Sequence, residues 1–246
     1  MKKHSGNIFI GIIYFLLYAP LLVMVFFSFN EAKSTSVFTG FSLKWYRELF
    51  SSSTTMTALK NTLILAVLSS VIATVIGTAA AVYIYYLRKK WWKNTLDIVT
   101  NIPMMNPDIV TGVSLMLLFV FVGRLVGAAN SLSFITLLIA HVTFNLPYVI
   151  LNVLPKLNQT DSHLVEAAQD LGSTPTEAFF RVILPAIMPG VTSGLLMAFT
   201  LSLDDFVISY YTTGSSFQTL PLLIFSMTKK AVKPDMYALS TIIFVT

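Results

Sequence analysis

The chain contains no cysteine and little charge. Of its 246 residues, 11% are Asp, Glu, Lys or Arg, whereas charged residues make up roughly 25% of an ordinary soluble domain. The lack of cysteine excludes disulfides and thiolate metal sites, and it leaves the redox compartment open. The three histidines, His4, His141 and His163, are too widely spaced to form a metal site without further ligands. We therefore predict no metal site and no cofactor in this chain.

Hydrophobic residues, by contrast, are in excess. They make up 55% of the sequence, and the mean hydropathy is +0.76. This composition predicts an integral membrane protein surrounded by lipid. The formal net charge of +5 suits loops that lie on anionic headgroups. No Arg-rich soluble surface with interleaved aromatic residues is present, which argues against nucleic-acid binding.

Long runs with little or no charge predict the membrane helices, each of which needs about 20 apolar residues. The runs are Ile8–Phe29, Asn61–Leu87, Ile98–Gly123, Leu132–Leu154, Val182–Leu203 and Met236–Thr246. The last run is too short to cross a bilayer, so we expect the sixth helix to be incomplete in this sequence. We predict an all-α polytopic membrane protein of six transmembrane helices, with one transmembrane domain over residues 1–246. Pro103 and Pro107 interrupt the third run and predict irregular backbone near Asp108, with the regular helix beginning at Asn106.

Flanking charges bear on the orientation in the membrane. The basic and aromatic cluster Arg88–Lys93 is typical of a cytoplasmic helix end and favours a cytoplasmic N-terminus. The number of Lys and Arg residues is the same on the two predicted sides of the membrane, so the count alone does not determine the orientation. The first run is too long for a signal peptide and lacks a small-residue cleavage site, so we interpret it as a membrane helix. Residues Phe41–Phe50 predict a short amphipathic helix at the interface. Within it, Trp45 is either an interfacial anchor or a cation–π wall for a cationic substrate.

Polar side chains share one face of the fourth run. His141, Asn145, Tyr148 and Asn152 are spaced by four, three and four residues. Such side chains either form hydrogen bonds with neighbouring helices or line a passage. In the fifth run, Gly190 and Gly194 form a GxxxG pattern that predicts close helix packing.

The longest polar segment between apolar runs is Asn158–Pro185. Leu164, Ala168 and Leu171 recur at the spacing of one helix face, and Gly172 follows as a helix stop. Three features predict a second helix: Thr174 as its N-cap, Pro175 in its first turn, and Glu177 three residues after the cap. The segment is thus predicted to form two helices joined by a glycine turn, with small residues beside the charged Glu166. This combination indicates a docking element for another protein.

This segment resembles the EAA loop of ABC-importer permeases, a pattern of Glu-Ala-Ala, three residues, Gly, nine residues and Ile-x-Leu-Pro. The matching residues are Glu166, Ala167, Ala168, Gly172, Val182, Leu184 and Pro185, with Val182 replacing the isoleucine of the family. The resemblance implies a type I importer architecture with residues 158–185 as the cytoplasmic coupling loop. It implies that Glu166 contacts an ATPase subunit, that Ala167 and Ala168 permit close approach, and that Gly172 forms the turn. It further implies that Val182 and Leu184 connect the loop to the fifth helix.

Three further segments resemble the polyamine permeases of this family: Asn106–Val110, His141–Phe144 and Phe199–Ser209. The resemblance implies transport of spermidine or putrescine by a complex with a homologous permease subunit, two ATPase subunits and an extracytoplasmic binding protein. ATP and Mg²⁺ would belong to the ATPase subunits, and this chain itself would not be an enzyme. The alternatives are a permease for another solute and a stand-alone channel or secondary transporter.

Carboxylates in membrane segments are costly and therefore indicate function. They are Asp108, Asp204 and Asp205, and with Trp45, Tyr148 and Asn145 they are our candidates for the substrate path. Asp108 has a second interpretation, because a negative charge stabilises a helix N-terminus. Asp204 and Asp205 are adjacent and therefore about 100° apart on a helix. At most one of them faces a given helix–helix seam along which substrate could pass, and the other is free to pair with a cation or to cap a helix end.

Overall fold

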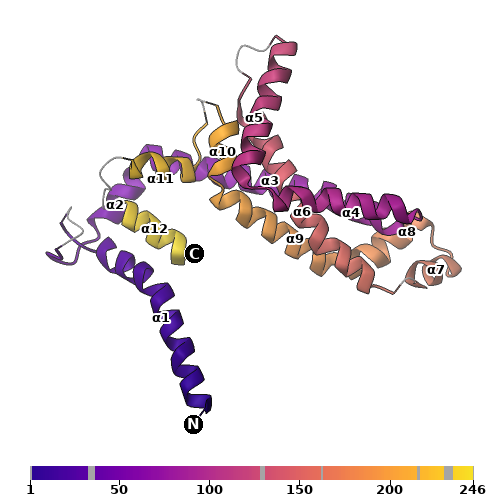
Figure 1. The fold of residues 1–246 in the computed structure, drawn as a ribbon, viewed down its shortest axis with the longest axis horizontal. Helices are drawn as coiled ribbons and strands as arrows, with labels where there is room; N and C mark the ends of the chain where they lie inside the picture. The colour runs from indigo at the N-terminus through magenta and orange to yellow at the C-terminus, as the bar shows by residue number, and fades with distance from the viewer. Residues whose placement is uncertain are drawn as a thin grey trace. The chain divides into compact units, whose positions relative to one another are not determined.

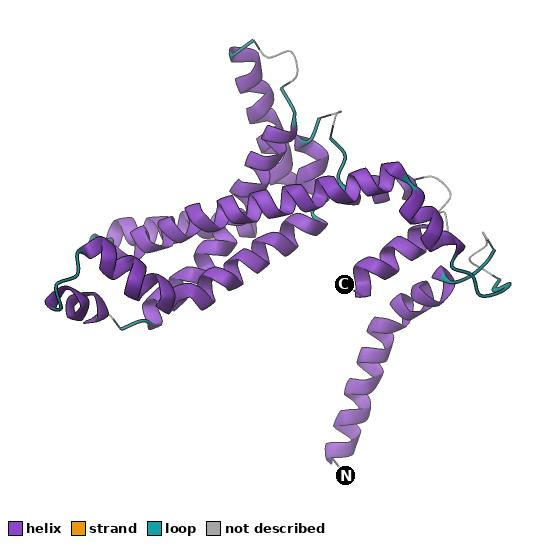
Figure 2. Ribbon diagram, turned by 180° about the vertical axis from the view of Figure 1, so that it is seen from behind, coloured by secondary structure: helices purple, strands orange, loops and turns teal. Residues whose placement is uncertain are grey.

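The computed structural model describes residues 2–32, 37–127, 131–161, 163–214, 217–229 and 235–245. Their regular elements are helices, and their extended pairing is limited to an isolated bridge between Asn30 and Phe41 (Figures 1 and 2). The all-α prediction is confirmed. The chain divides into two compact units, one of residues 1–59 and 223–246 and the other of residues 60–222.

Five stretches of the described residues are long and apolar enough to span a membrane. They are Phe9–Ser28 within α1 (Lys2–Ser28), α3 (Ser53–Tyr86), α5 (Asp108–Leu125), α6 (Phe134–Gln159) and the continuous helical stretch Pro175–Asp204. That last stretch consists of α8 (Pro175–Ala178), the π-helical η1 (Phe179–Ile183) and α9 (Leu184–Asp204). A shorter apolar helix, α12 (Asp235–Val245), corresponds to the predicted sixth run, whose last residue, Thr246, lies outside the described residues.

The third predicted run is not one helix. Residues Lys90–Met105 form α4, which includes the basic cluster, and α5 begins only at Asp108 rather than at Asn106. Asn106 has extended backbone, with a ψ of 141°, because a residue before proline is driven out of the helical region. Pro107, the N-cap of α5, is also extended, with a ψ of 136°. Pro103 lies in the last turn of α4 and does not end it.

The smaller unit is built from α1, α2 (Lys44–Ser51), α12 and most of α11 (Leu220–Thr228). Helix α12 packs against both α1 and α2. The amphipathic helix predicted at residues 41–50 is α2, which buries Trp45 and Leu49 and exposes Arg47 and Glu48.

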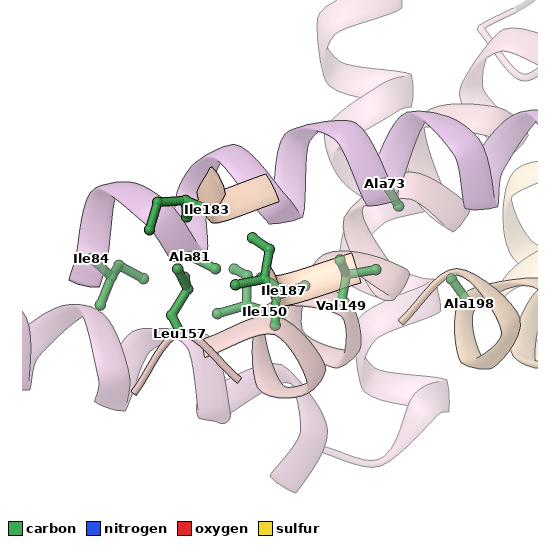
Figure 3. Close-up of a cluster of buried hydrophobic side chains, with 10 residues drawn as sticks. Ala73, Ala81, Ile84, Val149, Ile150, Leu157, Ile183, Ile187 and Ala198 are labelled. Atoms are coloured by element: carbon green, nitrogen blue, oxygen red, sulfur yellow. The ribbon is translucent and has the colours of Figure 1, made fainter. Parts of the chain in front are cut away.

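The larger unit has a core formed by α3, α6 and α9. Figure 3 shows side chains from these three helices interleaved, among them Ile84 of α3, Val149 and Leu157 of α6, and Ile187 of α9. Glycines bring the helices together, because a Cβ built at Gly77 would lie 2.8 Å from Val149 Cβ and one at Gly194 would lie 3.3 Å from Val149 Cα. The close packing predicted from the GxxxG pattern is therefore confirmed.

Gly190→Ala is expected to destabilise the protein, because the added Cβ would lie 2.8 Å from the backbone oxygen of Asn152 and 2.9 Å from Lys156 Cβ. Overpacking of this kind costs about 1–3 kcal/mol. The measurement is the thermal unfolding midpoint of the detergent-solubilised protein. The control is Gly11→Ala in α1, where nothing lies within 4 Å of the new Cβ. A midpoint for Gly190→Ala equal to or above that of the control would contradict the packing described here.

Candidate functional site

The coupling loop predicted at residues 158–185 has the expected helix, turn and helix. Helix α6 ends at Gln159, α7 covers His163–Asp170, and α8 begins at Pro175. Gly172 adopts a φ of +90°, a conformation that side chains other than glycine rarely adopt. Its N–H donates to Gln169 O at 2.8 Å, and the N–H of Ser173 donates to Ala168 O at 3.0 Å. These two bonds form a Schellman turn, which explains why a glycine ends α7.

The second half of the loop begins with the predicted capping box. The N–H of Glu177 donates to Thr174 Oγ1 at 3.3 Å, and the N–H of Thr174 donates to Glu177 Oε2 at 3.0 Å. Thus two N–H groups that the helix itself leaves without partners are satisfied reciprocally. Pro175 occupies the first turn, where its missing N–H costs nothing.

The surface of α7 is more exposed than the apolar spacing predicts. Of the three residues on the predicted apolar face, Ala168 is buried, whereas Leu164 is exposed and Leu171, which lies beyond the end of α7, is 89% exposed. The side chain of Glu166 is 74% exposed and forms a 3.2 Å contact with His163 Nδ1. This hydrogen bond, together with the charges of Asp161 and Glu166, raises the pKa of His163 above its ordinary value. The loop therefore presents the carboxylate of Glu166, the small residue Ala167 and an exposed leucine, while Ala168 is covered by its own chain.

The loop joins α9 through a π-helical turn. Ile183 is 4% exposed and belongs to the core cluster of α3, α6 and α9, while Leu184 is partly buried against that cluster and Pro185 is exposed. Sequence reasoning chose Val182 and Leu184 as the connecting residues and missed Ile183. A π turn shifts the helical register by one residue, and nothing in the side-chain pattern reveals that shift.

The candidate carboxylates lie at helix ends. Asp108 is the first residue of α5 and is exposed, and it is close enough to Tyr148 of α6 for the two side chains to interact electrostatically. Tyr148 packs edge-on against Phe144, with ring centroids 5.4 Å apart. Asp204 is the last residue of α9 and is exposed. Asp205 follows it and precedes α10 (Val207–Thr212), and its side chain is only 7% exposed.

The polar face of α6 forms hydrogen bonds with neighbouring helices. His141 Nε2 lies 3.0 Å from Ser209 Oγ, Asn145 Nδ2 donates to Ser202 Oγ at 2.7 Å, and Ser193 Oγ donates to Asn152 Oδ1 at 2.8 Å. The first of the two interpretations is thus confirmed for these residues. Asn145, a candidate for the substrate path, is 0% exposed within this chain.

Ser202 and Ser209 are partners that sequence reasoning missed. Ser202, Asp205 and Ser209 are spaced at i, i+3 and i+7. This helical spacing of polar residues is the sequence signal that could have identified the two serines. Ser202 also shares a 2.9 Å hydrogen bond with Ser69 of α3. Two polar atoms here, His141 Nδ1 and Asn145 Oδ1, are buried without a hydrogen-bond partner among the described residues.

Trp45 lies in the smaller unit. It is 3% exposed, and its indole N–H donates to Asn30 O at 2.7 Å. Lys44 Nζ lies 5.2 Å from the centre of the ring. The ring is therefore packed within its own unit, and its contact with a membrane or a substrate stays a prediction.

A family described as the binding-protein-dependent transport system inner membrane component matches residues 73–246. The putrescine transport system permease protein PotI of Escherichia coli K12 is 40% identical over 92% of this chain and 81% of its own length. The spermidine/putrescine transport system permease protein PotC of Haemophilus influenzae is 42% identical over 97% of this chain and 90% of its own length. A PotC homolog of Mycoplasma genitalium is 31% identical over 99% of this chain and 88% of its own length.

Solved structures give the same fold at low identity. The chain superposes with a TM-score of 0.74 on the crystal structure of a bacterial ABC transporter involved in the import of the acidic polysaccharide alginate. The match covers 98% of this chain and 89% of the other at 16% identity. A crystal structure of a bacterial alginate ABC transporter in complex with an alginate pentasaccharide-bound periplasmic protein gives a TM-score of 0.72 at 17% identity, over 98% and 88% of the two chains.

Proposed function

The chain belongs to the family of binding-protein-dependent transport system inner membrane components, and we propose that it is the permease subunit of an ATP-driven importer of polyamines. The observation that carries this proposal is the 39–42% identity, over more than nine-tenths of the chain, to the PotC and PotI proteins. A permease of this kind transports its substrate and does not transform it, so ATP hydrolysis belongs to separate subunits.

The charges of the candidate site support a polycationic cargo. Asp108 and Asp204 are exposed carboxylates at the ends of apolar helices, and Tyr148 offers an aromatic surface beside Asp108 for a methylene chain. The alginate transporters share only the fold with this chain, and a fold does not determine the substrate.

We place this chain in a complex with a homologous permease subunit, two ATPase subunits and an extracytoplasmic binding protein. The exposed side chains of Glu166, Ala167 and Leu171 suit contact with an ATPase subunit. If α1, α3, α5 and α6 each cross the membrane once, the coupling loop lies on the same side as the N-terminus. Since ATP is cytoplasmic, both would face the cytoplasm. The polyamine would pass along the seam between the two permeases by alternating access.

The test uses the complete importer reconstituted in liposomes with its binding protein. Spermidine or putrescine is expected to stimulate ATP hydrolysis and to accumulate inside. Stimulation by anions or sugars but by neither polyamine would overturn the cargo assignment. It would leave the family assignment unchanged.

A further inference from the structure

Asp204 and Asp205 are adjacent in sequence but lie in opposite environments. Asp204 is exposed at the end of α9. The side chain of Asp205 is 7% exposed. The helix ends at Asp204, and the extended backbone of Asp205, with φ −62° and ψ 121°, turns the two carboxylates apart.

The carboxylate of Asp205 is occupied by donors from its own chain. Oδ1 accepts the N–H of Ile208 at 3.2 Å, and Oδ2 accepts the N–H of Ser209 at 2.8 Å. Two backbone donors and burial of the side chain therefore leave this carboxylate with little capacity for an ammonium group. These bonds are those of a residue that caps the start of α10.

His141 completes this arrangement from α6. It is 0% exposed, and its Nε2 lies 3.0 Å from Ser209 Oγ and 3.5 Å from Asp205 Oδ2. Because Asp205 Oδ2 can only accept and lies 3.5 Å from Nε2, we assign the proton of the neutral imidazole to Nε2, which then donates to Ser209 Oγ. Nδ1 is then a bare acceptor, in agreement with its lack of a partner, and a second proton there would be a buried donor with no acceptor.

The capped helix α10 in turn holds the first turn of α5. A Cβ built at Gly112 would lie 3.0 Å from Tyr211 Cδ2 and 3.5 Å from Val207 O, both of α10. Gly112 lies about one helical turn after Asp108. The orientation of Asp108 therefore depends on where α10 begins.

We propose that the two neighbouring aspartates have different tasks, with Asp204 contacting the polyamine and Asp205 acting as a positioning residue. Held by Ser209 and His141, Asp205 fixes α10, and through α10 it fixes both Asp204 and Asp108. This assignment rests on the proposed function. It chooses between the roles that the sequence left open for Asp204 and Asp205, with helix capping assigned to Asp205 and substrate contact to Asp204.

The experiment measures the KM and maximal rate of spermidine uptake by the complete importer, together with the amount of assembled complex. Asp204→Asn is expected to raise the KM on the order of tenfold, because a charge-assisted contact is lost, with the assembled complex present in normal amount. Asp205→Ala is expected to reduce the assembled complex and the maximal rate and also to raise the KM, because α10 no longer fixes Asp204 and Asp108. Asp205→Asn, which removes the charge but keeps a capping oxygen, is expected to leave the KM within about twofold of the unaltered importer. Asp205→Asn should restore most of the lost complex, because an amide oxygen still accepts an N–H and asparagine is a good cap.

His141→Ala provides a second readout, since it should reduce the assembled complex and the maximal rate in the same way as Asp205→Ala although it removes no carboxylate. The inference is overturned if Asp205→Asn raises the KM as much as Asp204→Asn while the complex assembles normally. It is equally overturned if Asp204→Asn has a normal KM. Failure of the proposed function is a different result, namely no polyamine uptake by the unaltered importer.

Discussion

Glu166→Lys is expected to abolish polyamine uptake and the association of the ATPase subunits. Glu166 is exposed on α7, next to Ala167 and close to the exposed Leu171. A lysine there would reverse the charge of the surface that we propose an ATPase subunit covers. Loss of a buried charge pair at an interface costs about 2–5 kcal/mol, which corresponds to roughly 30-fold to 4,000-fold in affinity.

The measurement is co-purification of the ATPase subunits with the permease, alongside uptake. Glu48→Lys is the matched control, because Glu48 is also exposed and α2 has 8 residues, as does α7. It should retain both association and uptake. Normal uptake by Glu166→Lys would exclude ATPase docking at this residue and favour a stand-alone channel, which would be nearly indifferent to the change.

Asp108→Asn is expected to lower polyamine uptake at least tenfold at low substrate concentration while the complex assembles normally. The substitution removes the charge of an exposed carboxylate beside Tyr148 and keeps the size of the side chain, and a hydrogen bond to a charged group is worth enough to give this factor. The same charge stabilises the N-terminus of α5 by only about 0.3–1 kcal/mol, so folding should tolerate its loss.

Uptake is measured across substrate concentrations, with the amount of complex determined in the same membranes. Asp97→Asn in α4 is the control, an aspartate on the helix that precedes α5, and it should leave the KM unchanged. A normal KM for Asp108→Asn together with less assembled complex would mean that Asp108 serves only the N-terminus of α5.

Local signals predicted the parts of the structure that depend on few residues. The apolar runs located the membrane-length helices, and Gly172, Thr174 and Glu177 located the turn and the second helix of the coupling loop. These features are determined by a residue's own conformational preference or by a partner three positions away.

The sequence predictions failed where a residue's role or a helix boundary depends on tertiary contacts or on helical register. The interruption at Pro103 and Pro107 was recognised, but only Pro107 breaks the helix, because Pro103 lies in the final turn of α4, where little of the helix remains to be disrupted. The buried role of Ile183 depends on the π turn. The role of Asp205 depends on His141, a residue distant in sequence that α6 brings within 3.5 Å.

The unbroken helical backbone from Pro175 to Asp204 has a mechanical consequence. Its 30 residues span about 45 Å at 1.5 Å per residue, and its two ends are α8 of the predicted coupling loop and the exposed carboxylate of Asp204. The π-helical turn Phe179–Ile183 and the prolines Pro185 and Pro189 are places where such a helix bends. The first non-helical backbone after it is at Asp205 and Phe206. A movement of the loop therefore reaches Asp204 through a continuous helix that can bend near the loop, and the next joint is the one before α10.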